Sequence, residues 1–236
     1  MAGLKGILKD PLLSVVMPVY NEKDTIREIV GRVKAVPVRT ELIIVDDGSK
    51  DGTREILTEL SQQYEFTLIF QPQNGGKGEA LRRGFQEVTG DLVVIQDADL
   101  EYSPEEFPDL IELICQGRAD VVYGSRFIGR HRVFMFTHYA GNRLLTLITN
   151  VLYNTMLTDM ETCYKVMRIE VLRSFKLDSP GFGIEPELTA KIFKRGYRVY
   201  EVPITYDGRG YDEGKKITWR DGIVALWILL KYRFTE

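Results

Sequence analysis

The chain has 236 residues, of which 44% are hydrophobic and 28% are charged, a composition typical of a folded globular protein. A chain of this length buries enough surface to fold without disulfides or a structural metal, which excludes the small disulfide-stabilised scaffolds. The net charge of -3 argues against a protein that coats nucleic acid through bulk positive charge, so any anion site must be local.

The expected strands and helices of the first half alternate along the chain. Short apolar runs and stretches of helical periodicity follow one another, which predicts βαβ units around a mainly parallel sheet. The expected strands are Leu12–Val19, Glu41–Asp46, Phe66–Gln71, Asp91–Gln96 and Asp120–Gly124, with helices at about 24–35, 51–63, 77–89 and 104–116. Asp24, Asp51 and Ser103-Pro104 suit the first turns of three of these helices. Residues 12–124 therefore form the expected nucleotide-binding half.

The second half, about 125–236, is less regular. It predicts a helix at about 138–157, a strand at Cys163–Arg168, a helix at about 185–195, a strand at Val199–Thr205 and a helix at about 217–233. No repeat or long linker separates the halves, so we expect one α/β domain over 1–236. The last helix places apolar residues near one face and basic residues at its end, which fits either core packing or a membrane interface: Trp219, Ile223, Leu226, Trp227, Leu230, Lys231 and Arg233.

Cysteine spacing and hydropathy bear on the compartment. Cys115 and Cys163 lie far apart, outside any Cys-x-x-Cys spacing, so we expect two buried thiols rather than a disulfide framework. The first ten residues lack an apolar stretch long enough for a signal peptide. The longest apolar run, residues 222–230, is less than half of the roughly 20 residues that a membrane-spanning helix needs. We therefore expect a cytoplasmic protein that is not integral to a membrane.

Carboxylates cluster after two of the expected strands, in Asp46-Asp47-Gly48-Ser49 and in Asp97-Ala98-Asp99-Leu100-Glu101. Ligands of open α/β sheets bind outside the carboxyl ends of the strands. Asp97, Asp99 and Glu101 offer hard oxygen ligands for Mg²⁺ or Mn²⁺ bridging a diphosphate. The alternative is an acidic turn that caps the following helix.

Two further segments fit a nucleotide site. The first strand runs into Val16-Met-Pro-Val-Tyr-Asn-Glu22, and the third is followed by Asn74-Gly-Gly-Lys-Gly78. Such a glycine-rich turn can bring backbone N–H groups and one lysine to a phosphate, although a solvated loop is the commoner outcome.

The order and spacing of these motifs resemble the family 2 glycosyltransferases of the GT-A fold. The matching segments are Pro18-Val-Tyr-Asn-Glu22, Asp46-Asp-Gly-Ser49 with Asp51-Gly-Thr53, Asn74-Gly-Gly-Lys-Gly78 and Asp97-Ala-Asp99. Within the family, the chain is similar to the dolichol-phosphate mannose synthase branch in Gly124-Ser-Arg-Phe127, Cys163-Tyr-Lys-Val-Met-Arg168, Gly181-Phe-Gly-Ile-Glu185 and Glu201-Val-Pro-Ile204. The resemblance implies transfer of a sugar from a nucleotide donor to a polyprenyl phosphate on the cytosolic side of a membrane.

The resemblance also implies a donor site. The nucleotide sugar would contact Pro18, Tyr20, Asn21, Glu22, Asp46, Asp47, Gly48, Ser49, Asn74, Lys77, Asp97, Ala98 and Asp99. Asp97, Asp99 and Glu101 would hold the cation, with Glu101 where the mannose synthases often carry Gln. The expected catalytic residues are Asp97, Asp99, Arg126 and Glu185.

A basic stretch follows the fifth expected strand. Its arginines and histidines predict a bound anion, or alternatively a solvated loop that pairs with acids elsewhere. The expected ligands of an acceptor phosphate are Arg126, Arg130, Arg132 and His138, joined by Arg209 and Lys215 from the segment Tyr206–Lys216. That glycine-rich segment is predicted either to close over the donor as a lid or to be a surface loop.

The chemistry of the acceptor separates the candidate functions. A phosphate monoester is ionised near neutral pH and needs no base, whereas a hydroxyl acceptor needs one, for which Glu185 and Glu187 are candidates. We predict an inverting, metal-dependent transfer of a hexose from GDP-mannose or a UDP-sugar to a polyprenyl phosphate. We also expect peripheral contact with a membrane and no nucleic-acid partner. The alternatives are a family 2 transferase acting on a sugar hydroxyl and a non-catalytic nucleotide-sugar-binding protein.

Overall fold

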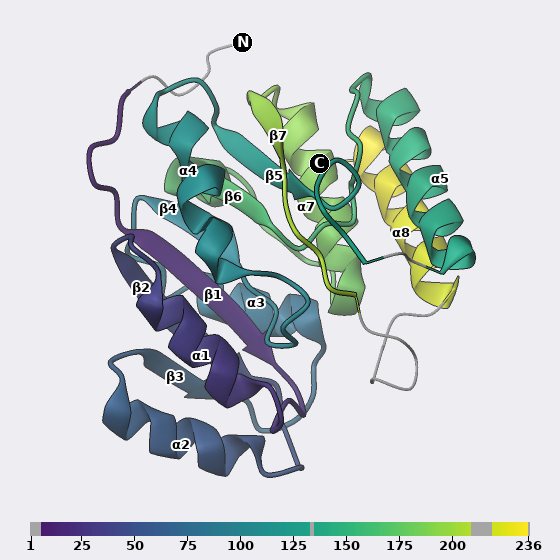
Figure 1. Ribbon diagram of the computed structural model, residues 1–236. Coiled ribbons are helices and arrows are strands. Elements are labelled where there is room, and N and C mark those ends of the chain that lie inside the picture. The colour runs from purple at the N-terminus through teal and green to yellow at the C-terminus, as the bar shows by residue number, and fades with distance from the viewer. Residues whose placement is uncertain (1–5, 133–134, 209–218, 236) are drawn as a thin grey trace.

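The computed structural model describes residues 6–132, 135–208 and 219–235, arranged around a seven-stranded sheet (Figure 1). The strands are β1 Leu13–Val19, β2 Thr40–Asp46, β3 Thr67–Phe70, β4 Leu92–Ile95, β5 Val121–Ser125, β6 Lys165–Arg168 and β7 Val199–Pro203. Their order across the sheet is β3-β2-β1-β4-β6-β5-β7. Of these seven strands only β6 runs antiparallel to its neighbours, so the sheet is mainly parallel as predicted.

Helices cover both faces of this sheet. They are α1 Ile26–Ala35, α2 Thr53–Gln63, α3 Lys77–Phe85, α4 Phe107–Cys115, α5 Phe136–Tyr153, α6 Ile169–Arg173, α7 Ile184–Lys194 and α8 Trp219–Phe234, with 3-10 turns at Pro104–Glu106 and Gly181–Gly183. In Figure 1, α1 and α4 lie in front of the sheet and α3 lies behind it. Helices α5 and α8 pack on each other and on α7 at one side of the molecule (Figure 1).

The core follows from strands that are covered on both faces. In β1 every residue except Pro18 is buried, and Leu13, Val15 and Met17 are completely inaccessible to solvent. Such continuous apolar burial is what a parallel strand between two helical layers requires. The main hydrophobic cluster extends from β1 and β2 through β5 and β6 to α7, so both halves of the sequence share it.

The predicted elements are found within a few residues of their expected bounds, but some details differ. Asp51 supports the start of α2 as predicted, because its Oδ1 accepts the N–H of Thr53 at 3.1 Å. The prediction for α1 is wrong, since Thr25 rather than Asp24 precedes its first turn and makes no side-chain cap bond. Cys163 is a buried free thiol as expected, whereas Cys115 is only partly buried.

The antiparallel direction of β6 decides which residues reach the functional edge of the sheet. The parallel strands β1, β2, β4 and β5 all end at one edge. Because β6 pairs with β4 in the opposite direction, Leu92 with Arg168 and Val93 with Met167, its first residue lies beside the last residue of β4. The segment that precedes β6 therefore meets the carboxyl end of β4.

In the described part of the chain, no helix combines the length and the apolar character that crossing a bilayer would require.

Candidate active site

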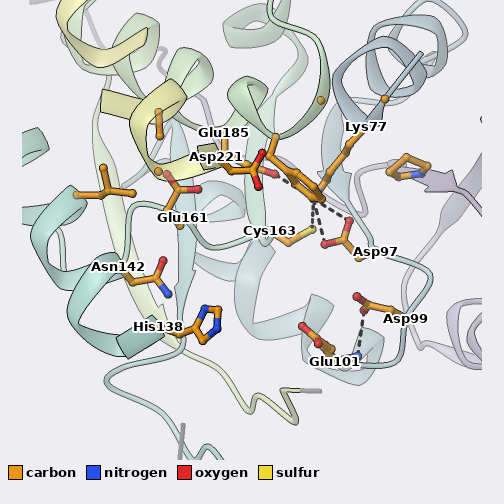
Figure 2. A pocket seen from close by; sticks show the side chains of 18 of the residues that line it. Lys77, Asp97, Asp99, Glu101, His138, Asn142, Glu161, Cys163, Glu185 and Asp221 are labelled. Atoms are coloured by element: carbon orange, nitrogen blue, oxygen red, sulfur yellow. Dashed lines mark hydrogen bonds and ion pairs between the residues drawn. The ribbon is translucent and has the colours of Figure 1, made fainter. Parts of the chain in front are cut away.

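A cavity of about 1050 Å³ opens at the carboxyl edge of the sheet. Its walls come from the end of β1, the loop after β4, the first turns of α3 and α7, and the helices α5 and α8. The residues predicted from the sequence that line it are Pro18, Tyr20, Glu22, Asp47, Asn74, Lys77, Asp97, Ala98, Asp99, Glu101, Arg126, His138 and Glu185. The fold thus gathers distant motifs around one space (Figure 2).

Other predicted residues lie elsewhere. Those that do not line the cavity are Asn21, Asp46, Gly48, Ser49, Arg130 and Arg132. Arg130 and Arg132 are exposed, and the Arg132 guanidinium donates to the carbonyl oxygen of Gly208 at 3.2 Å. Arg209 and Lys215 fall outside the described residues.

The four remaining residues, Asn21, Asp46, Gly48 and Ser49, lie at the end of β2 and in the loops that follow β1 and β2. The buried Asp46 carboxylate accepts the N–H of Gly48 at 3.1 Å and pairs with Arg54 Nε at 2.6 Å. Ser49 Oγ accepts the N–H of Asn21 at 2.9 Å, which joins this loop to the end of β1. Gly48 has a φ of +77°, and a Cβ there would meet the backbone nitrogen of Asn74 at 2.8 Å. These residues shape the wall rather than face the cavity.

The glycine-rich turn is bound from within the protein. Both carboxylate oxygens of Asp47 accept a backbone N–H, from Gly75 and from Gly76, each at 2.8 Å. The N–H groups of Gly75 and Gly76 are therefore engaged within the protein, and the phosphate contact predicted for this turn stays a prediction. Asp47 instead fixes the turn, so that α3 begins beside the cavity with Lys77 as its first residue.

Lys77 is the centre of a charged cluster in the cavity (Figure 2). Its Nζ lies 2.8 Å from an Asp97 oxygen, 3.2 Å from Glu185 Oε1 and 3.7 Å from Cys163 Sγ. Burial alone would lower the pKa of Lys77, but the charges around it, Asp97 first, raise that pKa well above its ordinary value. Burial likewise would raise the pKa of Asp97, and the Lys77 charge lowers it. The pair is therefore ionised before any substrate binds.

The expected metal ligands separate into two groups. Asp97 turns toward Lys77 and Cys163, whereas Asp99 and Glu101 lie together on the other side of the loop (Figure 2). Asp99 Oδ1 accepts the N–H of Glu101 at 3.2 Å, and Glu101 Oε2 accepts the hydroxyl of Tyr206 at 2.5 Å. Among the residues that the structure describes, no three acidic, histidine or cysteine side chains form a complete metal-binding group. The carboxylates of Asp99 and Glu101 nevertheless supply the hard oxygen donors that Mg²⁺ or Mn²⁺ prefers.

Arg126 lines the cavity but its charge is already neutralised. Its Nε and one terminal nitrogen each lie 2.7 Å from an oxygen of Asp159, which also accepts the Arg126 backbone N–H at 3.0 Å. The guanidinium lies 5.2 Å from the centre of the Tyr206 ring. Arg126 thus ties the loop after β5 to the segment before β6.

Glu185 and Glu187 are also paired. Glu185 Oε2 lies 2.6 Å from Nζ of the fully buried Lys165. Glu187 does not line the cavity and accepts the N–H groups of Asp178 and Ser179. Neither carboxylate is placed as the free base that a hydroxyl acceptor needs.

Sequence reasoning missed several lining residues, above all Glu161, Asn142 and Asp221. Glu161 lies two residues before Cys163 and two residues after the buried Asp159. The acidic pair in Thr158-Asp-Met-Glu161 was a usable signal, but a parallel β6 would have placed it at the opposite edge. The remaining two come from helix surfaces, where polar residues ordinarily face solvent.

The mouth of the cavity is bordered by apolar helix surface. Large hydrophobic residues of α5 and α8 are exposed: Phe136, Tyr139, Leu144, Leu147, Val151, Ile223, Val224, Trp227, Leu230 and Phe234. Tyr139, Leu144 and Ile223 also line the cavity. For α8, three residues of the predicted apolar stripe, Ile223, Trp227 and Leu230, are exposed, and the buried residues Ile228 and Leu229 lie outside that stripe.

Two curated proteins are similar to this chain in sequence. A dolichol-phosphate mannosyltransferase of Pyrococcus furiosus is 32% identical over 86% of this chain, and the match spans 58% of that protein. A polyprenol monophosphomannose synthase of Mycolicibacterium smegmatis is 30% identical over 83% of this chain and 77% of its own length.

A solved structure and a family model complete the comparison. The crystal structure of glucosyl-3-phosphoglycerate synthase from Mycobacterium tuberculosis in complex with Mn²⁺, uridine diphosphate and phosphoglyceric acid superposes with a TM-score of 0.75. It covers 96% of this chain and 80% of its own at 24% identity, and it confirms the predicted α/β GT-A fold. The model of the family described as glycosyl transferase family 2 matches residues 14–175, from β1 to just beyond α6. The four motifs gathered around the cavity lie within that match, and this chain belongs to glycosyl transferase family 2.

Proposed function

We propose that this protein is an inverting, metal-dependent hexosyltransferase that moves a hexose from a nucleotide sugar to the phosphate of a polyprenyl phosphate. One observation carries the proposal: a single cavity connects the family motifs after β1 and β4 with the exposed apolar surfaces of α5 and α8. The two curated relatives, a dolichol-phosphate mannosyltransferase and a polyprenol monophosphomannose synthase, support the substrate class.

The donor end of the cavity offers both apolar and polar contacts to a nucleotide sugar. Pro18 and Tyr20 provide flat surface for a base and ribose, and Asn74 provides an amide. Asp97 holds the Lys77 ammonium beside the loop after β4, where this group would donate hydrogen bonds to the diphosphate. The related Mycobacterium enzyme was crystallised with uridine diphosphate and Mn²⁺, which supports a nucleotide and a cation at this edge of the fold.

Asp99 and Glu101 are the residues that would hold the cation. Mg²⁺ commonly binds one or two carboxylates together with substrate phosphates, so two carboxylates are a sufficient protein contribution. When bound, the cation stabilises the negative charge of the departing nucleoside diphosphate. Asp97 pairs with Lys77, so we assign the cation to Asp99 and Glu101 rather than to all three predicted carboxylates.

The acceptor reaction follows from positioning. An oxygen of the acceptor phosphate attacks the anomeric carbon while the bond from that carbon to the diphosphate breaks on the opposite face, which inverts the configuration. The phosphate is already ionised, so no proton has to be removed, in agreement with the pairing of Glu185 by Lys165. His138 and Arg220 line the cavity on the side of α5 and α8 and are our candidates for phosphate binding.

Contact with the cytosolic face of a membrane would bring the lipid to the cavity mouth. The exposed aromatic and aliphatic residues of α5 and α8 are of the kind that insert at a bilayer interface. Arg143, Lys231 and Arg233 are exposed on the same two helices and would meet lipid phosphates.

The test is transfer from a labelled donor with and without the acceptor phosphate. GDP-mannose, UDP-glucose and UDP-N-acetylglucosamine are each incubated with Mn²⁺ and either geranylgeranyl phosphate or geranylgeraniol. We expect product only with the phosphate. Asp99→Asn should lower turnover by about a hundredfold or more, while Asp109→Asn, an exposed aspartate on α4, should leave it unchanged. Equal transfer to geranylgeraniol, or full activity of Asp99→Asn with a chelator, would contradict the proposal.

A further inference from the structure

Glu161 lines the cavity, and one of its carboxylate oxygens has no hydrogen-bond partner among the described residues. It belongs to the segment Thr158–Cys163, which the antiparallel β6 brings to the functional edge of the sheet. Its Oε1 is buried and accepts no hydrogen bond among the described residues. A buried polar atom without a partner is costly, so its retention beside a substrate cavity calls for a functional reason.

The charged groups around Glu161 are already engaged with one another. Lys165 on β6 pairs with Glu185 on α7, and Arg126 after β5 pairs with Asp159. Burial is the main cause that raises the pKa of Glu161, to about 7; Lys165 and Arg126 lower it, and Glu185 and Asp159 raise it. Neither cation is therefore free to neutralise Glu161.

This arrangement selects the chemistry of the missing partner. A phosphate or carboxylate would be repelled, because the carboxylates of Glu185 and Asp159 already lie close enough to Glu161 to raise its pKa. An uncharged hydrogen-bond donor fits, and a hydroxyl is the donor that a sugar carries. The proposed acceptor group is a phosphate monoester, so the hydroxyls at the reacting end of the cavity belong to the hexose of the donor.

We propose that Glu161 accepts a hydrogen bond from a hydroxyl of the transferred hexose and so helps to select the sugar, an inference that rests on the proposed function. Glu161 lies two residues before Cys163, whose thiol contacts Lys77 in the charged cluster (Figure 2). Pro18 and Tyr20, which we assign to the base and ribose, lie at the end of β1 and just after it, and β4 separates β1 from β6 in the sheet. Glu161 is therefore placed to bind the sugar and not the nucleotide.

The experiment separates sugar binding from nucleotide binding. Dissociation constants are measured by calorimetry with Mn²⁺ for UDP, GDP, UDP-glucose and GDP-mannose, on the wild type and on Glu161→Met and Glu161→Gln. Glu106→Gln is the matched control, because Glu106 also has a buried oxygen without a partner but does not line the cavity.

The expected signature is a change in a ratio. In Glu161→Met the nucleoside diphosphate should bind within about twofold of wild type, while the affinity for the matching nucleotide sugar falls about tenfold or more, as for a buried hydrogen bond to a charged group. Glu161→Gln keeps an acceptor oxygen and should lose less, and Glu106→Gln should lose nothing.

Two other outcomes are informative in different ways. An unchanged ratio in Glu161→Met, with normal binding of both ligands, overturns the role of Glu161 and leaves the proposed function standing. A reduced rate of transfer at saturating donor with an unchanged ratio also overturns it, since Glu161 would then serve the acceptor. Failure of the wild type to bind any of the four ligands with Mn²⁺ overturns the proposed function itself.

Discussion

Arg126 illustrates how a basic residue in a predicted phosphate site can serve the fold instead. Both of its charged contacts go to Asp159, whose side chain is completely buried, while the Arg126 side chain is 10% exposed. A buried ion pair costs desolvation on both sides and becomes strongly unfavourable when one partner is lost. The stability of the pair and its use by a substrate are therefore separable by mutation.

Asp159→Asn tests that separation at the level of stability. It leaves the Arg126 charge buried without a counter-ion, so we expect the free energy of unfolding in urea to fall by about 3–5 kcal/mol. Glu59→Gln is the control, because the Arg27–Glu59 pair has the same 2.7 Å distance but is exposed, and it should change little. Unchanged stability of Asp159→Asn would show that the fold does not depend on the Arg126–Asp159 pair, and Arg126 would again be a candidate phosphate ligand.

Glu161 gives a second test, through pH. Its pKa of about 7 lies above the ordinary 4.5, so the protonated form favours the fold. That contribution is complete below pH 4.5 and is lost as the pH rises through 7. Glu161→Gln cannot ionise, so wild type should lose about 2–3 kcal/mol relative to this variant between pH 5 and pH 8. Urea unfolding at each pH measures this, and parallel stability curves for the two proteins would show that Glu161 does not titrate in this range.

At the scale of elements, helix α3 depends on a close approach to the sheet. A Cβ at Gly84 would lie 2.5 Å from Val16 Cγ1 and 3.2 Å from Val45 Cγ2, whereas a Cβ at Gly31 on α1 would meet nothing within 4 Å. Gly84 is therefore needed for the packing of α3 on the sheet, whereas Gly31 is not needed for the packing of α1.

Alanine at these two positions should therefore have opposite effects. We expect Gly31→Ala to raise the free energy of unfolding by up to about 1 kcal/mol, since alanine favours the helix. Gly84→Ala gains the same propensity but overpacks the core, and we expect a net loss of about 1–2 kcal/mol. Thermal unfolding of both variants checks this, and a stabilised Gly84→Ala would mean that α3 moves away from the sheet at little cost.

The sequence alone predicts the helices and strands that have a clear hydrophobic periodicity, and it predicts the loops that follow parallel strands. Asp97 and Asp99 are predicted as cavity residues because their loop directly follows β4, and Lys77 because it begins α3. Glu161 was not, because strand direction comes from pairing with β4 and β5, which the local pattern of Cys163–Arg168 does not encode. Asp46 does not line the cavity, because its carboxylate is buried and paired with Arg54 on α2, a contact that the local sequence pattern does not reveal.

At the scale of the whole molecule, the exposed apolar residues are concentrated on α5 and α8 beside the cavity mouth. Phe136 is 78% exposed and Trp227 is 65% exposed. Surface of this kind on one side of a protein indicates an interaction site. Our proposal assigns it to a lipid surface.

Vesicle sedimentation tests that assignment. The wild type should bind phosphatidylglycerol-containing vesicles, and the double variant Phe136→Ser, Trp227→Ser should bind several-fold more weakly, because buried apolar area and basic charge drive interfacial binding. Phe70→Ser is the control, as Phe70 is exposed on β3 at the far edge of the sheet (Figure 1). Equal binding of both variants would place the membrane contact elsewhere.

The position of β6 also has a consequence for how the chain assembles. Strands β4 and β5 are not paired with each other in the sheet; β6 lies between them and is synthesised after both. Until residue 168 has left the ribosome, the edges of β4 and β5 that will face β6 have no partner. Closing the sheet is therefore a late, long-range event, of the kind that slows folding and exposes strand edges to aggregation. The insertion of β6 between β4 and β5 brings Glu161 to the cavity. Before that insertion, the nascent chain exposes unpaired strand edges and is prone to aggregate with other chains.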